Sequence, residues 1–416
     1  MKAAILGYGK SGQSAEKILK VNGITNIDIY DDSLASYPNI TEVKEGYDTI
    51  VVSPGLDLNK LNIDKDNVTN EIDLAYSKID NNAKIIGVTG TNGKSTITYL
   101  TEQILNNYGI KAKACGNIGY PFGEAVLEQY DAYVVELSSF QIDLIKLFKA
   151  DSSCISNITD DHFDRYGNLE NYVNAKLKIL DITKFKVYAL NDNILKEKLT
   201  GFARFIDKDL SSYPFIEDEV MKFGNFYVNL QKFNLFGWHN KVNLAFALSL
   251  ASEVVNLNGD VTNLISNLKG LPHRCEYVAE IKGNIYINDS KGTNVDSTLV
   301  ALKSIDDDCI LILGGKDKGG NFGLLADLIN KKVKSLILYG AAAEKIESQL
   351  NGKIHVKCHK VNLLKDAVYK AYELSRDTSY VLFSPGCASF DQFKNFEERG
   401  EYFKKYVFEI KGLANA

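Results

Sequence analysis

The segment Gly-Val-Thr-Gly-Thr-Asn-Gly-Lys-Ser-Thr, residues 87–96, connects an apolar run at 84–88 to a helical pattern at 95–106. In a glycine-rich turn between a strand and a helix, backbone N–H groups converge on phosphate oxygens, and the helix N-terminus adds partial positive charge. Lys94 would reach the β- and γ-phosphates of a nucleotide, and one of the two hydroxyl groups that follow it would reach Mg²⁺. The segment therefore predicts a P-loop, with the departure that Val88 stands where a glycine is usual.

A second glycine-rich turn lies near the N-terminus. Residues 7–12 read Gly-Tyr-Gly-Lys-Ser-Gly, follow the apolar run Ala3–Leu6 and precede a helical pattern at 13–20. The next apolar run, Ile27–Tyr30, closes on Asp31. A strand, G-x-G-x-x-G, a helix and an acid about twenty residues later form the dinucleotide-binding fingerprint. This pattern predicts a diphosphate site and leaves open whether the ligand is a nicotinamide or flavin cofactor.

Apolar strand-like runs alternate with helical patterns almost throughout the chain, which is typical of parallel α/β architecture. With 416 residues the chain is too long for one ordinary core. The alternation of strands and helices restarts after residues 80–82 and again near Gly270. The last helix before Gly270 is predicted at 240–255, with Asn240 as its N-cap. We therefore predict three α/β domains: a Rossmann-like domain at 1–82, a central P-loop ATPase-type domain with a parallel sheet at 83–270, and a second Rossmann-like domain at 271–416.

Composition excludes several classes of protein. The formal net charge of -5 gives no reason to expect a nucleic-acid partner. No apolar run approaches the roughly 20 residues of a membrane span, and the N-terminal apolar run is too short for a signal peptide. Six scattered cysteines without a C-x-x-C pair are typical of reduced thiols. We expect a cytoplasmic protein.

Acidic side chains follow two further strands of the central block. Glu136 comes directly after the apolar run 132–135, at the sheet edge where a second ligand for the Mg²⁺ of a P-loop is needed. Residues 157–166 hold three acids, an arginine and His162, a set that can bind a metal or a polyanion. The alternatives are a charged loop residue at 136 and helix-capping acids at the start of the second loop.

Three polar loops follow strands of the third block, at 288–294, 314–320 and 384–391. Because loops at the carboxyl ends of parallel strands open onto one crevice, we expect them to lie together. Their donor side chains suit an anionic small molecule; they are Lys291, Thr293, Lys318 and Ser389. The alternative is that these glycine- and lysine-rich stretches are solvated turns.

Taken together, these motifs resemble the ATP-dependent murein (Mur) peptide ligases, over essentially the whole chain. The resemblance is carried by GTNGKST (90–96), GNIGYP (116–121), ELSSFQ (136–141), DHFDRYGNLENYVNAKLKI (161–179), GWHNKVN (237–243), LPHRCE (271–276), NDSKGTN (288–294), GGKDKGG (314–320) and SPGCASFDQFKNFEERG (384–400). The P-loop and the His/Asp/Arg loop identify a superfamily that includes the folylpolyglutamate synthases. The run CASFDQFKNFEERG is similar to the branch that adds D-glutamate.

The resemblance implies an enzyme of peptidoglycan precursor synthesis. Such a ligase transfers the γ-phosphoryl group of ATP to a substrate carboxylate, and the amine of an amino acid attacks the acyl phosphate through a tetrahedral intermediate. The products are an amide, ADP and phosphate. The implied substrates are UDP-N-acetylmuramoyl-L-alanine and D-glutamate, with two Mg²⁺ ions, and the implied enzyme is a monomer.

The resemblance also implies roles for individual residues. The catalytic set would be Lys94, His162, Lys176 and Arg274. ATP would contact Gly90, Thr91, Asn92, Gly93, Lys94, Ser95, Thr96, Asn240, Asn243, Arg274 and Asp289. The UDP-linked substrate would contact Lys10, Ser11, Asp31, Ser53, Pro54, Gly55, Asn117 and His162, and D-glutamate would contact Thr293, Lys318, Ser389 and Phe396. The metal ligands would be Ser95, Thr96, Glu136, His162 and Lys176, the last as a carbamate.

Three alternatives remain open at this point. One is another Mur-type or folylpolyglutamate-type ligase with a different amino acid, although nothing in the latter type calls for the N-terminal G-x-G-x-x-G domain. A second is a nicotinamide-dependent oxidoreductase that uses residues 7–12. The third is a regulator that binds ATP without catalysis.

Overall fold

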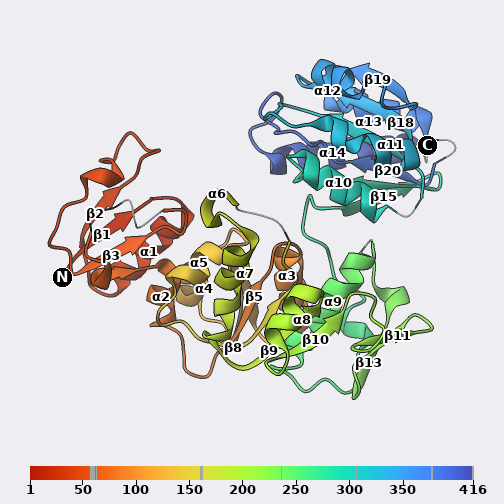
Figure 1. The fold of residues 1–416 in the computed structure, drawn as a ribbon. Helices are drawn as coiled ribbons and strands as arrows, with labels where there is room; N and C mark the ends of the chain where they lie inside the picture. Colours follow the sequence, from red (N-terminus) through yellow and green to blue (C-terminus); the bar gives the residue numbers. More distant parts are fainter. Residues whose placement is uncertain are drawn as a thin grey trace. The chain divides into compact units, whose positions relative to one another are not determined.

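The computed structural model describes residues 1–56, 61, 63–159, 163–235, 237–305, 307–375 and 378–414. The chain forms two compact units (Figure 1): unit 1 is Met1–Phe233 with Val242–Leu268, and unit 2 is Asn234–Lys241 with Lys269–Ala416. Both units are α/β, which confirms the predicted fold class. The division into three domains at 82/83 and 270/271 stays a prediction. No helix in the described part of the chain is long and apolar enough to cross a membrane.

A small parallel sheet opens unit 1, in the order β2-β1-β3-β4. Its strands are β1 (Lys2–Leu6), β2 (Asn26–Tyr30), β3 (Thr49–Val52) and β4 (Val68–Thr69), and its helices are α1 (Lys10–Val21) and α2 (Glu71–Tyr76). Alternate residues of β1 point to opposite faces, so Ile5 packs in the cluster with Ala15 and Leu19 of α1 while Leu6 packs in the other cluster. The turn after β1 therefore lies between β2 and β3, where the strand order changes direction.

A larger parallel sheet follows, in the order β10-β9-β8-β5-β7-β6. Its strands are β5 (Lys84–Thr89), β6 (Ala112–Gly116), β7 (Ala132–Glu136), β8 (Ala150–Ile155), β9 (Thr183–Asn191) and β10 (Ala203–Asp207). The helices of this part are α3 (Lys94–Asn107), α4 (Phe122–Glu128), α5 (Ser139–Leu144), α6 (Phe163–Tyr166), α7 (Leu169–Leu177), α8 (Asn193–Leu199) and α9 (Trp238–Ala251). Because β5 lies between β7 and β8, the loops that follow these three strands meet at one edge of the sheet.

Two expectations about this region were incomplete or wrong. A small sheet was not predicted; it consists of β11 (Phe215–Glu217), β12 (Val220–Lys222), β13 (Phe226–Asn229) and β14 (Gly259–Asp260). Its strands have two to four residues, too few to show a period in sequence. Asn240 is not an N-cap, because α9 already begins at Trp238.

Unit 2 is built on one six-stranded sheet, in the order β15-β16-β20-β17-β18-β19, in which only the β15–β16 pair is antiparallel. The strands are β15 (Glu276–Ile281), β16 (Asn284–Asn288), β17 (Cys309–Gly314), β18 (Val333–Tyr339), β19 (Lys357–Val361) and β20 (Tyr380–Phe383). The helices are α10 (Val295–Ser304), α11 (Ala326–Lys332), α12 (Ala343–Leu350), α13 (Leu364–Leu374) and α14 (Phe396–Ala414).

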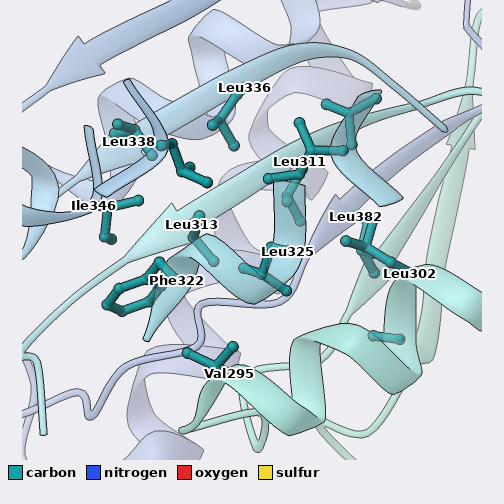
Figure 2. Packing of buried hydrophobic residues seen from close by; sticks show 14 of the residues in the cluster. Val295, Leu302, Leu311, Leu313, Phe322, Leu325, Leu336, Leu338, Ile346 and Leu382 are labelled. Atoms are coloured by element: carbon teal, nitrogen blue, oxygen red, sulfur yellow. The ribbon is translucent and has the colours of Figure 1, made fainter. Parts of the chain in front are cut away.

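The core of unit 2 has two layers because both faces of this sheet are covered. Leu311 and Leu313 of β17 pack with Leu302 of α10 and Ile346 of α12 in one cluster (Figure 2). The alternate residues of the same strands pack against α13 and α14 on the other face. Strands buried on both faces read as continuous apolar runs, which is why β16, β17, β18 and β20 were visible in the sequence. The edge strands β15 and β19 alternate buried or half-buried with exposed residues, and β15 was not predicted.

One buried carboxyl group joins the two parallel sheets of unit 1. Glu71, at the start of α2, accepts hydrogen bonds from Ser14 Oγ of α1 at 3.0 Å and from the Gly123 N–H of α4 at 2.5 Å. Its neighbour Asp73 accepts three backbone N–H groups of residues 146–148. Burial raises the pKa of Glu71 to about 7 because the charged form is desolvated.

This shift predicts a pH-dependent stability that Glu71→Gln should abolish. Glu71 stays protonated in the folded chain up to about pH 7, whereas in the unfolded chain it ionises above its ordinary pKa, so the wild-type free energy of unfolding falls as pH rises toward about 7. Between pH 5 and pH 8, denaturant titration should show the variant gaining about 2 to 3 kcal/mol relative to wild type. Glu217→Gln, which removes an exposed salt bridge to Lys222 and leaves the surroundings of Glu71 unchanged, is the control. Parallel pH profiles for wild type and Glu71→Gln would contradict the expectation.

Candidate functional site

The turn between β5 and α3 requires glycine at two positions. Gly90 has φ +143° and Gly93 has φ +86°, the latter as the residue that caps α3. A Cβ on Gly90 would lie 2.0 Å from Ser156 Oγ, and a Cβ on Gly93 would lie 2.6 Å from Asn243 Oδ1. The turn is therefore packed closely against the loop after β8 and against α9, which leaves its backbone in one conformation.

The loop after β8 holds this turn by hydrogen bonds. The Thr91 N–H donates to the Asn157 carbonyl at 2.8 Å, and the Asn92 N–H donates to Asn157 Oδ1 at 2.9 Å. Ser156 Oγ donates to the Asn92 carbonyl. The N–H groups of Thr91 and Asn92 are thus engaged within the protein. Asn157 opens the candidate loop 157–166, but neither it nor Ser156 was predicted to hold the turn; their position directly after a strand was the available signal.

Two lysines meet at one carbonyl oxygen of the turn. Lys94 Nζ and Lys176 Nζ donate to the Gly90 carbonyl at 2.9 and 2.8 Å, and Lys94 also donates to the Thr91 carbonyl at 2.8 Å. Lys176 is only 1% exposed, and its ammonium group lies 4.7 Å from the centre of the Tyr172 ring. Two ammonium groups at one acceptor create a positive site that suits a polyanion. Ser95 and Thr96 follow Lys94 in the first turn of α3.

A carboxylate lies at the neighbouring strand end. Glu136, the last residue of β7, is 1% exposed, and its Oε1 accepts a hydrogen bond from Asn117 Nδ2 at 2.9 Å. Its Oε2 is buried without a hydrogen-bond partner. A buried carboxylate oxygen without a partner is costly, and a cation would relieve that cost. Within the described residues no group of three acidic, histidine or cysteine side chains could hold a metal; His162 lies outside those residues.

One pocket of about 460 Å³ in unit 1 collects residues from both of its parallel sheets. The small sheet contributes Lys10 and Ser11 at the start of α1 and Pro54 and Gly55 after β3. The larger sheet contributes Lys94, Gly116, Asn117, Gly119, Pro121, Ser138, Ser139, Phe140, Gln141, Tyr172 and Lys176. The pocket therefore unites the two glycine-rich turns that were separate motifs in the sequence. Neither Asp31 nor Ser53 is among its lining residues.

The N-terminal turn has the geometry that its fingerprint predicts. Gly7 has φ +88°, and a Cβ there would lie 2.6 Å from Ser53 Oγ, which donates to the Gly7 carbonyl at 2.9 Å. A Cβ on Gly12 would lie 2.2 Å from the Gly7 carbonyl oxygen. Asp31 accepts the Tyr8 N–H at 2.6 Å, and this bond, with those from residues 33 and 34, lowers the pKa of Asp31. Asp31 and Ser53 therefore shape the turn, and their contact with a UDP-linked substrate stays a prediction.

In unit 2, the loops after β16, β20 and β17 lie side by side, as predicted. The Gly386 N–H donates to the Gly292 carbonyl at 2.9 Å, and Lys316 and Ala388 exchange two backbone hydrogen bonds. Of the four candidate side chains for an amino acid, Ser389 is buried, Thr293 and Phe396 are half-buried and Lys318 is exposed. Their roles remain predictions, although they belong to adjoining segments.

The other unit 2 candidates lie around the start of its sheet. Asp289 follows β16, and it accepts hydrogen bonds from Ser384 Oγ at 2.7 Å and from the Cys275 N–H at 3.2 Å. Burial raises the pKa of Asp289 to about 6. Arg274 is exposed. Asn240, which lies in the segment of α9 that belongs to unit 2, is one turn before Asn243.

The sequence interpretation missed Arg399. Its side chain is fully buried, and it donates to the Ser290 carbonyl at 2.7 Å, to Ser290 Oγ at 3.0 Å and to the Cys387 carbonyl at 3.0 Å. It thus ties the loop after β16 to the loop after β20. A charged residue on α14 gave no sign in sequence that it would point inward.

We expect Gly93→Ala to weaken nucleotide binding far more than Gly109→Ala does. Both glycines have similar positive φ, +86° and +93°, so both variants carry backbone strain of about 1 kcal/mol. Only the Cβ at 93 meets another group, Asn243, whereas the Cβ at 109 meets open space. Calorimetry with ADP should show at least a tenfold loss of affinity for Gly93→Ala alone. Equal losses in the two variants would contradict the close packing of this turn.

Comparisons with known proteins identify two matching family models and nearly full-length relatives. A family model described as the Mur ligase middle domain matches residues 88–257, and one described as Mur ligase, glutamate ligase domain matches residues 273–387. A UDP-N-acetylmuramoylalanine--D-glutamate ligase of Francisella tularensis subsp. novicida (strain U112) is 37% identical over 422 residues, with 99% of this chain and 96% of the relative covered. The corresponding ligase of Francisella philomiragia is 38% identical, with 99% and 97% covered.

Solved structures share the fold at lower identity. The MurF ligase from Thermotoga maritima in complex with ADP has a TM-score of 0.59 and 18% identity, with 88% of this chain and 90% of that chain covered. The folylpolyglutamate synthase from Mycobacterium tuberculosis complexed with ADP has a TM-score of 0.57 and 12% identity, with 80% and 92% covered. These likenesses concern the fold alone.

Proposed function

This chain belongs to the Mur ligase family and is an ATP-dependent, ADP-forming ligase, and we propose that it joins D-glutamate to UDP-N-acetylmuramoyl-L-alanine in peptidoglycan precursor synthesis. The observation that carries the proposal is the pocket of unit 1, where Lys94 and Lys176 face the same space as the diphosphate-type turn of Lys10 and Ser11. One turn would hold the phosphates of ATP and the other the diphosphate of the acceptor. The amino acid is assigned from relatives 36–38% identical over nearly the whole chain.

The chemistry requires positive charge at this place. A carboxylate is a poor electrophile because its leaving group would be oxide, and phosphorylation supplies a usable leaving group. Negative charge then grows on the transferred phosphoryl group and on the acyl oxygen. Lys94 would hold the β- and γ-phosphates, with the backbone of Gly90–Thr96 around them. The N–H groups at the start of α3 would face the phosphates, since those of Thr91 and Asn92 are already engaged.

The residues near Glu136 fit a magnesium ion. The unpartnered Oε2 of Glu136 offers a hard oxygen ligand, and the hydroxyls of Ser95 and Thr96 start the adjacent helix. Mg²⁺, when bound, would neutralise charge on the phosphate oxygens. A second metal ion would involve His162 and Lys176. Lys176 would bind it as a carbamate, which converts a buried cation into an anionic oxygen ligand.

The remaining roles complete the proposal. Asn240 and Asn243 would contact adenine, and Arg274 and Asp289 would contact ATP. Asn117 and His162 would contact the muramoyl part of the acceptor, Asp31 would lie near uracil, and Ser53 would support the turn beneath it. Thr293, Lys318, Ser389 and Phe396 would hold D-glutamate. We further propose a monomer in the cytoplasm, for which the six unpaired cysteines are favourable.

The assay for this function is phosphate release screened across amino acids. Purified protein with ATP, Mg²⁺ and UDP-N-acetylmuramoyl-L-alanine should release phosphate only when D-glutamate is added. Phosphate release with L-lysine or L-alanine instead would indicate a ligase with a different amino acid substrate. ATP binding without phosphate release for any amino acid would support the alternative of a non-catalytic regulator. Quenching of NADH fluorescence would support the oxidoreductase alternative, and we expect none.

Lys94→Ala should lower the rate of phosphate release roughly a thousandfold or more, since the γ-phosphoryl group loses its main cation. The control is Lys178→Ala, which removes an exposed lysine paired with Asp143 and should keep near wild-type activity. A Lys94→Ala enzyme within tenfold of wild type would overturn the assignment of this lysine.

Lys176→Ala tests the carbamate. The variant should be inactive, added bicarbonate alone should not restore it, and a short-chain carboxylic acid should restore part of the activity by replacing the carbamate. The substitution also removes the buried hydrogen bond from Lys176 to the Gly90 carbonyl, so lost activity alone does not test the carbamate. The informative result is whether the carboxylic acid restores activity. Full activity of Lys176→Ala in ordinary buffer would refute the metal role.

A further inference from the structure

Arg165 connects two walls of the pocket without being one of its lining residues. From α6, its Nη1 donates to the Pro54 carbonyl at 3.0 Å, and Nη2 makes a longer contact of 3.5 Å with the Leu56 carbonyl. The guanidinium carbon lies 4.3 Å from the centre of the Phe140 ring. Pro54 belongs to the loop after β3 and Phe140 to α5, so one side chain spans groups that come from the two parallel sheets.

The geometry of these contacts requires a guanidinium group. A planar fork can donate to two carbonyl groups of one turn while its face lies on an aromatic ring. An ammonium group has no such plane, so a lysine could keep the charge but not both contacts. The turn itself is closed by a hydrogen bond from the Leu56 N–H to the Ser53 carbonyl at 3.1 Å. Arg165 therefore binds an already formed turn as a unit.

Helix α6, which carries Arg165, is held against α5 and α7 on the side of the pocket that includes Lys176. The adjacent Tyr166 stacks on Phe140 with ring centres 5.8 Å apart, and its hydroxyl donates to Asp143 at 2.8 Å. Asn171 of α7 donates to the Tyr166 carbonyl at 2.8 Å. Since α7 also carries Lys176, the anchoring of α6 is continuous with the helix that places an ammonium group at Gly90.

The turn Ser53–Leu56, which Arg165 contacts, is also bonded to the N-terminal glycine-rich turn. Ser53 Oγ donates to the Gly7 carbonyl at 2.9 Å, and the pocket lining includes Lys10 and Ser11 from the same turn. A chain of contacts thus runs from the diphosphate-type turn, through Ser53–Leu56, to Arg165, α6 and α7. Its two ends are the places assigned to the acceptor diphosphate and to the transferred phosphoryl group.

We propose that Arg165 is a positioning residue that sets the separation between the acceptor-diphosphate wall and the phosphoryl-transfer wall of the pocket. This inference rests on the proposed function, in which one UDP-linked molecule must reach both walls. Arg165 does not touch the reacting atoms; it holds Pro54 and Gly55 where the acceptor can bind them while its carboxylate lies near Lys94. Without it, acceptor binding weakens, and ATP binding does not change.

The test compares Arg165→Met with Arg204→Met. Methionine keeps a long unbranched side chain but removes every side-chain N–H donor and the guanidinium group over Phe140. Arg204 is a matched control because its guanidinium carbon also lies over an aromatic ring, 3.5 Å from the centre of Tyr213, and it is not among the pocket-lining residues. We expect Arg165→Met to raise KM for UDP-N-acetylmuramoyl-L-alanine about tenfold or more, with KM for ATP within twofold of wild type and the melting temperature close to that of Arg204→Met. Arg165→Lys should fall between wild type and Arg165→Met.

Equal increases in both KM values, or a loss of kcat that follows a drop in melting temperature, would show a merely structural role and overturn the proposal. If Arg165→Met does not fold, Arg165→Lys carries the same comparison. Calorimetric binding of UDP-N-acetylmuramoyl-L-alanine without D-glutamate separates this proposal from the proposed function. Unchanged acceptor affinity in the variants overturns the positioning role alone. Acceptor binding by wild type without turnover overturns the function alone, and no acceptor binding by wild type overturns both.

Discussion

The Gly90 carbonyl oxygen accepts hydrogen bonds from Lys94 and Lys176, and the site of unit 1 is organised around this shared acceptor. One lysine starts the helix after β5, and the other lies almost two turns into a helix that follows β8 in the chain. Both can reach one oxygen because β8 is the neighbour of β5 in the sheet. The close packing of Gly90 against Ser156 keeps that oxygen in place.

The same strand order places a carboxylate on the opposite side. Glu136 ends β7, the other neighbour of β5, and it has one oxygen bound to Asn117 and one without a partner. Positive groups at one strand end and a buried carboxylate at the next are individually unfavourable. In the proposed function, a nucleotide with its metal ion would neutralise both.

Much of this could be read from the chain. The strands at 84–88 and 132–135 were visible because buried parallel strands are continuous apolar runs. Both glycine-rich turns were visible because glycine is required where φ is positive or a Cβ would collide. The short strands at 215–229 were not, because three or four residues show no period. Arg399 was not either, since a buried charge follows from what surrounds it rather than from its own segment.

The amino-acid sequence was therefore sufficient to predict the two phosphate-type turns and the polar residues that follow strands. It was also sufficient to predict an α/β fold that places them at sheet edges. It carried no information about which turns share a pocket, because strand order in a sheet depends on long-range pairing. The structure of unit 1 joins residues 10–11, 54–55, 94 and 176 around one space, and links its walls through Arg165. That arrangement arises only when the sheets pack, since each contact lies between segments that are separated by tens of residues.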